Sequence, residues 1–229
     1  GEVRRRRWHS CDGPDRQDLE ALGFRRTGVL PVVPDFSHLD GAADRTAADL
    51  FDDTWTNVLF VGRMVPNKKL EDVIRFFHAY HSCYNPRSRL LLVGAHGGLD
   101  RYTAALHQLT AALGNGHVHF VGPVSNEELV AFYEIADLFL CASEHEGFCV
   151  PLVEAFYKQI PVLAYAAAAV PATMDGAGVL YNDKDPSHVA ALMDAVVSNS
   201  DVQEAIVRGQ LAAIARLRAR DFAGTLLGL

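Results

Sequence analysis

NVLFVGRMVPNKKLEDVIRFF (residues 57–77) contains the pattern that decides the fold. Residues 57–62 form a continuous apolar run that ends in glycine, which is typical of a strand buried on both faces. After Asn67 the apolar residues change to a helical spacing, which places one set of side chains on a single face: Leu70, Val73, Ile74 and Phe77. The stretch therefore predicts a buried strand, a loop and an amphipathic helix.

The same alternation continues along the chain. Further buried strands are predicted at residues 89–94, 117–122, 137–142, 161–165 and 178–181. Helices are predicted around 102–109, from the capping box at Ser125–Glu128, from Pro151, from Pro186, and after Asp201, whose partner Glu204 has capping-box spacing. Parallel strands require such crossovers, so the sequence predicts an α/β fold with a doubly wound, Rossmann-like parallel sheet over residues 52–219.

The remainder of the chain does not follow this alternation. We interpret residues 1–51 as an interdomain connection or the remnant of an N-terminal domain, and residues 220–229 as a C-terminal tail. The 229 residues, 49% hydrophobic and 21% charged, have an ordinary globular composition, which excludes collagen-like, coiled-coil and disordered classes. A chain of this length buries a sizeable core without disulfides or metals.

Charge and cysteine content restrict the partners and the compartment. The net charge of −7 argues against nucleic-acid binding, although Arg4–Arg7 form a basic run. That run fits a solvated tail, with a membrane surface or an anionic partner as the alternative. No apolar stretch approaches 18 residues, and four cysteines without metal or disulfide spacing favour reduced thiols in the cytoplasm. The expected location is cytoplasmic, with peripheral contact at the inner membrane face as the alternative.

The loop after the first strand carries two cations. Ligands bind outside the carboxyl ends of the strands in doubly wound sheets, and Gly62 there lets a ligand approach the backbone closely. Arg63 and Lys68 follow, and we expect Lys68 at the N-terminus of the next helix. A cation at that position makes most sense if an anion such as phosphate also binds there. A solvated loop edge is the alternative.

The loop after the fourth strand carries carboxylates. Glu146 lies in the loop and Glu154 in the helix that Pro151 opens, so both side chains can face the same crevice. Amide groups near Phe148 and Cys149 are available to an oxygen-rich ligand, and carboxylates accept hydrogen bonds from sugar hydroxyls. Stabilisation of the helix dipole by Glu154, with Glu146 solvated, is the alternative. The pair His117 and His119 lacks the further ligands that a metal needs, and we predict no metal site.

Taken in order, these segments resemble the C-terminal, donor-binding domain of GT-B retaining glycosyltransferases of family 4, group 1. The resemblance rests on VGRMVPNKKLEDVI (61–74), HFVGPVSNEELVAFYEIADLFLCAS (119–143) and EHEGFCVPLVEAF (144–156), the last with a Glu-x7-Glu motif at Glu146 and Glu154. It covers about residues 57–200. It implies a hexosyltransferase that uses a nucleoside diphosphate sugar, without cofactor or metal, and a saccharide or lipid-linked acceptor bound by an N-terminal domain that these 229 residues lack.

The resemblance also assigns roles. Arg63 and Lys68 would hold the donor diphosphate and, with Glu146 against the donor sugar, form the catalytic set. Glu154 would bind the ribose. The backbone of Gly62, Gly147, Phe148 and Cys149 would approach the donor, and the segment from Val121 to Val124 would frame the base.

Three positions depart from the family pattern. Cys149 and Gln159 stand where glycine is common, and Ala172 stands where a glutamate is usual. The Arg, Lys and Glu-x7-Glu set is retained. A GT-B sugar-nucleotide epimerase or phosphorylase, and a non-catalytic nucleotide-binding module, remain the alternative functions.

Overall fold

The structure is a computed structural model that describes residues 8–10, 21–23, 27–29, 32 and 34–220. The chain divides into two compact units, residues 35–214 and a second unit of residues 1–34 with 215–229. The second unit contains two short parallel strands, β1 (Trp8–Ser10) and β2 (Thr27–Val29). The basic run Arg4–Arg7 and residues 221–229 of the predicted tail lie outside the described residues.

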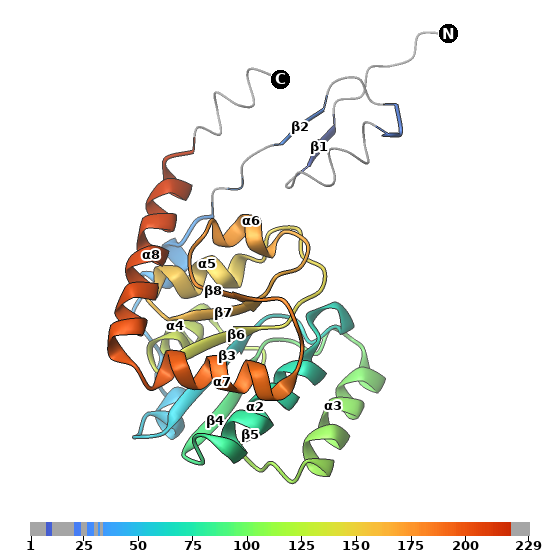
Figure 1. Ribbon diagram of the computed structural model, residues 1–229, viewed down its shortest axis with the longest axis vertical. Coiled ribbons are helices and arrows are strands. Elements are labelled where there is room, and N and C mark those ends of the chain that lie inside the picture. The colour runs from blue at the N-terminus through green and yellow to red at the C-terminus, as the bar shows by residue number, and fades with distance from the viewer. Residues whose placement is uncertain (1–7, 11–20, 24–26, 30–31, 33, 221–229) are drawn as a thin grey trace. The chain divides into compact units, whose positions relative to one another are not determined.

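The larger unit is built on a six-stranded parallel sheet (Figure 1). Its strands are β3 (Thr56–Val61), β4 (Ser88–Val93), β5 (Val118–Gly122), β6 (Leu138–Cys141), β7 (Val162–Tyr165) and β8 (Val179–Tyr181). The order across the sheet is β5-β4-β3-β6-β7-β8, which is the doubly wound Rossmann order. All six predicted strands and the predicted fold class are confirmed.

Helices cover both faces of this sheet. They are α2 (Leu70–Cys83), α3 (Asp100–Ala112), α4 (Asn126–Glu134), α5 (Val150–Tyr157), α6 (Val170–Met174), α7 (Pro186–Val197) and α8 (Ser200–Arg218). Figure 1 shows α2, α3 and α7 on one face, with α4 and α5 on the other. The predicted face of α2 is confirmed, because Leu70, Val73, Ile74 and Phe77 are all buried against the strands. None of the helices in the described part of the chain is both long and apolar enough to cross a membrane.

Of the helix caps predicted at Ser125 and Asp201, the first is confirmed and the second is wrong. The capping box at Ser125 and Glu128 is present, with both reciprocal hydrogen bonds formed. The proposed cap at Asp201 is wrong, because α8 begins earlier and Asn199 Oδ1 accepts hydrogen bonds at 3.1 Å from the amides of Asp201 and Val202. Asparagine caps helices as well as aspartate does, so the earlier residue takes the position.

Residues 35–51 belong to the same compact unit as the sheet, although the sequence analysis assigned them to the connection. They form two 3-10 turns, η1 (Ser37–Leu39) and η2 (Ala48–Phe51). The Phe36 ring stacks on Tyr157 of α5 at 4.7 Å, and the carbonyl of Phe51 accepts a hydrogen bond from the Asn57 amide at 3.0 Å. Apolar and backbone contacts therefore hold this segment against the domain.

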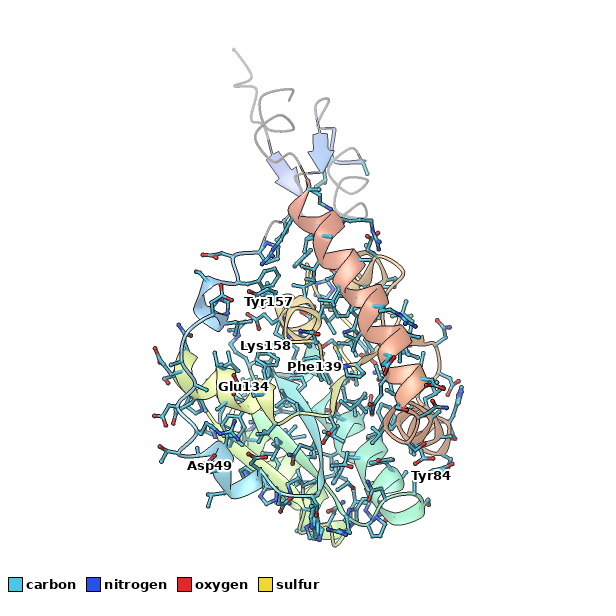
Figure 2. The ribbon with its side chains drawn as sticks, turned by 90° about the vertical axis from the view of Figure 1, so that its left-hand side faces the viewer. Asp49, Tyr84, Glu134, Phe139, Tyr157 and Lys158 are labelled. Carbon is cyan, nitrogen blue, oxygen red and sulfur yellow. The ribbon has the colours of Figure 1, made fainter. Side chains whose placement is uncertain are left out.

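Arg45 adds exposed ion pairs to the same segment. Its guanidinium reaches Asp49 at 3.0 Å, Glu134 of α4 at 3.3 Å, and Asp52. Figure 2 labels Asp49 and Glu134, which lie on the same side of the molecule as Tyr157. These side chains are exposed to water, so their ion pairs add little stability beyond orienting the segment.

Candidate functional site

The candidate site lies where the strand order reverses. β3 and β6 are neighbours in the centre of the sheet, and Val58 is in register with Leu138. The chain leaves β3 toward one edge and leaves β6 toward the other, so the loops after these two strands meet at their carboxyl ends, where doubly wound sheets bind their ligands. These are the two loops that the sequence analysis singled out, residues 62–69 and 142–149.

Backbone contacts fix the two loops to each other. The amide of Glu144 donates to the carbonyl of Asn67 at 2.9 Å, and the side-chain amide of Asn67 donates to the carbonyl of His145 at 3.0 Å. The first loop therefore holds the second at its centre, immediately before Glu146. These hydrogen bonds hold the two loops in one arrangement before any ligand binds.

Lys68 and Glu146 form an ion pair between the two loops. The Lys68 ammonium lies 2.5 Å from Glu146 Oε1, and the side chains are only 15% and 9% exposed. Both charges are removed from most of the solvent, so each depends on the other. The structure thus brings together two of the three predicted catalytic residues, and in direct contact.

Arg63 is the third of these residues, and its charge is not compensated. Its side chain is exposed, and its guanidinium makes no hydrogen bond or ion pair with any residue within the described ranges. It follows Gly62, whose amide donates to the carbonyl of Val93 at 2.9 Å and whose φ is 150°. The loop after β3 therefore carries one cation without a partner in the described residues, Arg63, and one cation that a carboxylate neutralises, Lys68.

Lys68 does not lie at the helix N-terminus, which corrects that prediction. Residues Pro66–Lys68 form a 3-10 turn, and Lys69 then adopts a left-handed conformation, φ 52° and ψ 48°, before α2 begins at Leu70. The proline cannot donate a backbone hydrogen bond, and the left-handed residue separates the two helical segments. The amide of Leu70 donates to the Tyr102 hydroxyl at 3.1 Å, so this group is already occupied.

Glu154 lies behind the loops on α5 and is 7% exposed. Its Oε2 accepts a hydrogen bond from the Tyr133 hydroxyl at 2.9 Å, and its Oε1 lies 2.9 Å from His38 Nε2. Burial, followed by the Glu154 charge, holds the pKa of Tyr133 far above its ordinary value, so Tyr133 remains a donor. Each carboxylate oxygen keeps a further lone pair, which a ligand hydroxyl can use.

Cys149 adopts the backbone conformation that favours the glycine usual at this position. It is the residue before α5, with φ 62°, a conformation that favours glycine, and its side chain is 8% exposed. A hydrogen bond from its thiol, against the effect of burial, lowers the pKa of Cys141 to about 7, and the same contact raises the pKa of Cys149. Gln159, the other departure, has φ 61° immediately after α5.

The remaining predicted site residues lie in two different parts of the domain. Gly147 is exposed and Phe148 is half-buried, and the Phe148 carbonyl accepts a hydrogen bond from Thr173 of α6 at 2.5 Å. The structure gives no acceptor, among the residues it describes, for the amides of Phe148 and Cys149. Val121 and Val124 belong to β5 and the loop after it, at the edge of the sheet, two strands from β3.

Lys184 is a site residue that the sequence analysis missed. It follows β8, and its ammonium lies 2.9 Å from both Asp72 and Glu144 and 3.2 Å from the carbonyl of Ala142. Burial opposes its charge, but the hydrogen bonds to Glu144 and Asp72 raise the pKa of Lys184. It therefore joins α2 to the loop that carries Glu146. Its place at the carboxyl end of a strand was the available signal.

We predict that Lys184→Met loosens this loop. The substitution leaves Asp72 without its lysine, frees the carbonyl of Ala142 and leaves Glu144 with Lys69 as its remaining cation, so hydrogen exchange of residues 142–149 should become at least tenfold faster. The unfolding free energy should fall by only about 1 kcal/mol, because Glu144 is 47% exposed. Exchange monitored by mass spectrometry measures both effects.

Lys158→Met is the matched control for this prediction. Lys158 lies at the end of α5 (Figure 2) and has no ion pair with any residue in the described segments. It should leave exchange in residues 142–149 unchanged. Equal exchange rates in the wild type and Lys184→Met would contradict the anchoring role.

The fold and the loops together define a class: a doubly wound α/β domain with two cations, Arg63 and Lys68, in the loop at its switch point. A sequence comparison makes this class specific, because the model of the family described as "Glycosyl transferases group 1" matches residues 46–210. The chain belongs to this family, which confirms the resemblance stated from the motifs.

Individual relatives agree with the family. The chain is 32% identical over 209 residues to D-inositol 3-phosphate glycosyltransferase of Geodermatophilus obscurus, covering 86% of this chain and 46% of that protein. It is 26% identical over 153 residues to O-antigen chain mannosyltransferase B of Escherichia coli, covering 66% of this chain and 39% of that protein. The chain thus spans less than half the length of these relatives.

Solved structures confirm the fold. The chain is similar to HepE of Anabaena, whose structure contains UDP and glucose, with a TM-score of 0.76 and 20% identity over 96% of this chain and 63% of that one. It is also similar to an α,α-trehalose-phosphate synthase of Burkholderia vietnamiensis, with a TM-score of 0.80 and 13% identity over 96% of this chain and 58% of that one.

Proposed function

We propose that this chain is the donor-binding part of a retaining hexosyltransferase and binds a nucleoside diphosphate sugar. One observation carries the proposal: Arg63, a cation without a partner among the described residues, lies in the same loop as Lys68, whose ammonium pairs with Glu146 at the switch point. Two cations at the end of a strand suit a diphosphate, since guanidinium and ammonium groups form charge-assisted hydrogen bonds with phosphate oxygens. Similarity to HepE, which was solved with UDP-glucose, supports the ligand class.

The ion pair suggests how the donor is received. When the diphosphate binds, Lys68 exchanges the Glu146 carboxylate for phosphate oxygens, and Glu146 becomes free to accept hydrogen bonds from the donor sugar. Transfer breaks the bond between the anomeric carbon and the phosphate oxygen, forms a bond between that carbon and the acceptor oxygen, and passes the proton of the acceptor hydroxyl to the departing diphosphate. Arg63 and Lys68 stabilise the negative charge on the departing nucleoside diphosphate, so we propose that no metal is required.

The other roles complete the site. The free amides at Phe148 and Cys149, with exposed Gly147 beside them, contact the donor. Gly62 permits close approach of the diphosphate, and the backbone from Val121 to Val124 frames the base. The acceptor, a saccharide or a lipid-linked hydroxyl, binds to an N-terminal domain, for which the relatives have the additional length.

The proposal extends to organisation and location. Residues 52–219 carry the donor-binding fold, residues 35–51 pack against it, and the residues before 35 belong to the connection to the N-terminal domain. Cys83, Cys141 and Cys149 are free thiols, which suits a reducing compartment, so we place the protein in the cytoplasm. Arg4–Arg7 would supply contact with the anionic inner face of the membrane.

The test is stabilisation by nucleotides. UDP, GDP and their hexose derivatives are added to the chain, and its melting temperature is measured. At a ligand concentration of 100 times Kd, the matching nucleotide should stabilise the fold by about 2.7 kcal/mol, a rise of several degrees for a domain of this size. If no nucleoside diphosphate shifts the melting temperature, the proposed function is wrong.

Glu154→Gln tests the ribose assignment. The neutral amide accepts a hydroxyl hydrogen bond more weakly than the carboxylate, so UDP or GDP affinity should fall about tenfold. Affinity for inorganic pyrophosphate, which has no ribose, should not change. Calorimetry measures both ligands.

His38→Ala is the control, because it removes the His38 contact and retains the Glu154 carboxylate. It should keep most of the nucleotide affinity. If Glu154→Gln weakens pyrophosphate and nucleotide equally, Glu154 acts on the site as a whole and does not bind the ribose.

A further inference from the structure

A hydrogen bond joins helix α6 to the loop that precedes α5. The Thr173 hydroxyl on α6 donates to the carbonyl oxygen of Phe148 at 2.5 Å, and Thr173 is only 6% exposed. A threonine inside a helix often donates to a carbonyl one turn earlier in the same helix, as Thr110 of α3 does to Leu106 at 3.0 Å. Thr173 instead reaches a carbonyl 25 residues earlier in the chain. The bond therefore fixes one particular peptide group of the loop, the one between Phe148 and Cys149.

This peptide group also carries an amide without a protein partner. All peptide bonds in the described residues are trans, and in a planar trans peptide the carbonyl and the amide of the next residue point in opposite directions. Because Thr173 holds the Phe148 carbonyl, the Cys149 amide points away from Thr173. That amide has no acceptor among the residues that the structure describes. The hydrogen bond to the carbonyl thus determines the direction in which the unpaired amide is presented.

The backbone of Cys149 makes this orientation costly to hold. Its φ is 62° and its ψ is 65°, a left-handed conformation that glycine adopts freely and that strains a residue with a side chain. A half turn of the Phe148–Cys149 peptide would exchange the positions of its carbonyl and its amide. It would also return φ of Cys149 to a negative value, where most residues lie. With cysteine at this position, the peptide therefore depends on the Thr173 hydroxyl more than it would with glycine.

We propose that Thr173 is a positioning residue for donor binding, because its hydroxyl holds the Phe148–Cys149 peptide with the amide toward the donor diphosphate. This inference rests on the proposed function, in which the Cys149 amide contacts the donor. A backbone amide donates a charge-assisted hydrogen bond to a phosphate oxygen. In the flipped orientation, the Phe148 carbonyl would present an acceptor to phosphate oxygens, which are acceptors themselves. Thr173 thus raises donor affinity without touching the donor.

Thr173→Val tests the proposal, because valine has the shape of threonine without its hydroxyl. Calorimetry of the whole chain with UDP and GDP should show an affinity about tenfold below that of the wild type. Thr173→Ser keeps the hydroxyl and should bind as the wild type does. Thr173→Val combined with Cys149→Gly should recover most of the affinity, because glycine holds the left-handed conformation without the hydrogen bond. A merely structural role for Thr173 would give no such recovery.

Thr110→Val is the matched control, since it also removes a threonine hydroxyl that donates to a carbonyl, but within α3. It should leave the nucleotide affinity unchanged. A second measurement needs no ligand: the three-bond coupling between the amide and α protons of Cys149, measured by NMR, reports φ. In Thr173→Val this coupling should change from the value of a left-handed residue toward that of an extended one.

The outcomes separate this inference from the proposed function. If the wild type binds a nucleotide and Thr173→Val binds it equally well, the positioning role is wrong and the proposed function stands. A loss of affinity that Cys149→Gly does not reverse, or an unchanged coupling at Cys149 in Thr173→Val, would overturn the positioning role as well. If neither UDP nor GDP binds the wild type, the proposed function fails, and the role of Thr173 in donor binding fails with it.

Discussion

Arg63→Ala should lower the affinity for UDP or GDP by about 30-fold or more, while the unfolding free energy stays within about 0.5 kcal/mol of the wild type. The guanidinium is exposed and has no partner in the described part of the chain, so its loss costs the folded state little. A diphosphate, by contrast, would lose charge-assisted and often bidentate hydrogen bonds. Calorimetry and urea denaturation measure the two quantities separately.

Two variants control this prediction. Arg208→Ala removes the same charge from an exposed position on α8 and should leave the affinity unchanged. Arg63→Lys retains the charge without the planar fork and should recover part of the affinity. If Arg63→Ala binds the nucleotide as the wild type does, Arg63 is not a phosphate ligand.

Lys68 should behave differently, because it already has a partner. Lys68→Met leaves the Glu146 carboxylate nearly buried without its cation, so both affinity and stability should fall. Adding Glu146→Gln removes that uncompensated charge and should restore most of the stability, but not the affinity. This separation of stability from binding would distinguish a phosphate ligand from a purely structural lysine.

Gly94→Ala should destabilise the domain by at least about 4 kcal/mol. Gly94 follows β4 with φ 135°, and an added Cβ would lie 2.2 Å from the carbonyl oxygen of Gly62. Backbone on both sides of this contact cannot move without separating the ends of β3 and β4. Urea denaturation measures the loss, and a variant too unstable to purify would agree with it.

Gly98→Ala separates the steric contact from the backbone conformation. Gly98 also has a positive φ, 70°, but an added Cβ would have no atom within 4 Å. Its substitution should cost only about 1 kcal/mol, the usual penalty for a left-handed residue. Similar losses in the two alanine variants would show that the contact with Gly62 is unimportant.

Most of the fold could be predicted because the spacing of apolar residues along the sequence indicates where the strands and helices lie. Residues 58–61 are apolar throughout, which predicts burial on both faces and a place in a parallel sheet. The short helix α6 was not predicted: residues 166–169 gave no periodic signal, and a helix of a single turn depends on its surroundings. The start of α8 was misplaced because Asn199 and Asp201 are equally good caps.

The site could be predicted less completely, since its contacts join distant parts of the chain. The positions of Arg63, Lys68 and Glu146 followed from the rule that ligands bind at strand ends. The partnership of Glu154 with His38 and Tyr133 had no local signal, because His38 lies 116 residues away. Lys184 reaches its partners by tertiary folding alone, and no spacing in the sequence connects residue 184 with residues 72 and 144.

If the site binds a diphosphate as proposed, the Lys68–Glu146 pair would also set a threshold for the charge of the ligands that it accepts. The Lys68 ammonium already lies 2.5 Å from the Glu146 carboxylate, which neutralises its charge. A ligand must therefore carry enough negative charge to replace Glu146 as the partner of Lys68. A diphosphate shared between Lys68 and Arg63 would meet that demand, whereas a phosphate monoester bound by Arg63 alone would leave the Lys68–Glu146 pair intact. The protein would then discriminate between diphosphate and monophosphate nucleotides because the ligand competes with Glu146 for Lys68. No group that recognises the shape of the second phosphate would be needed.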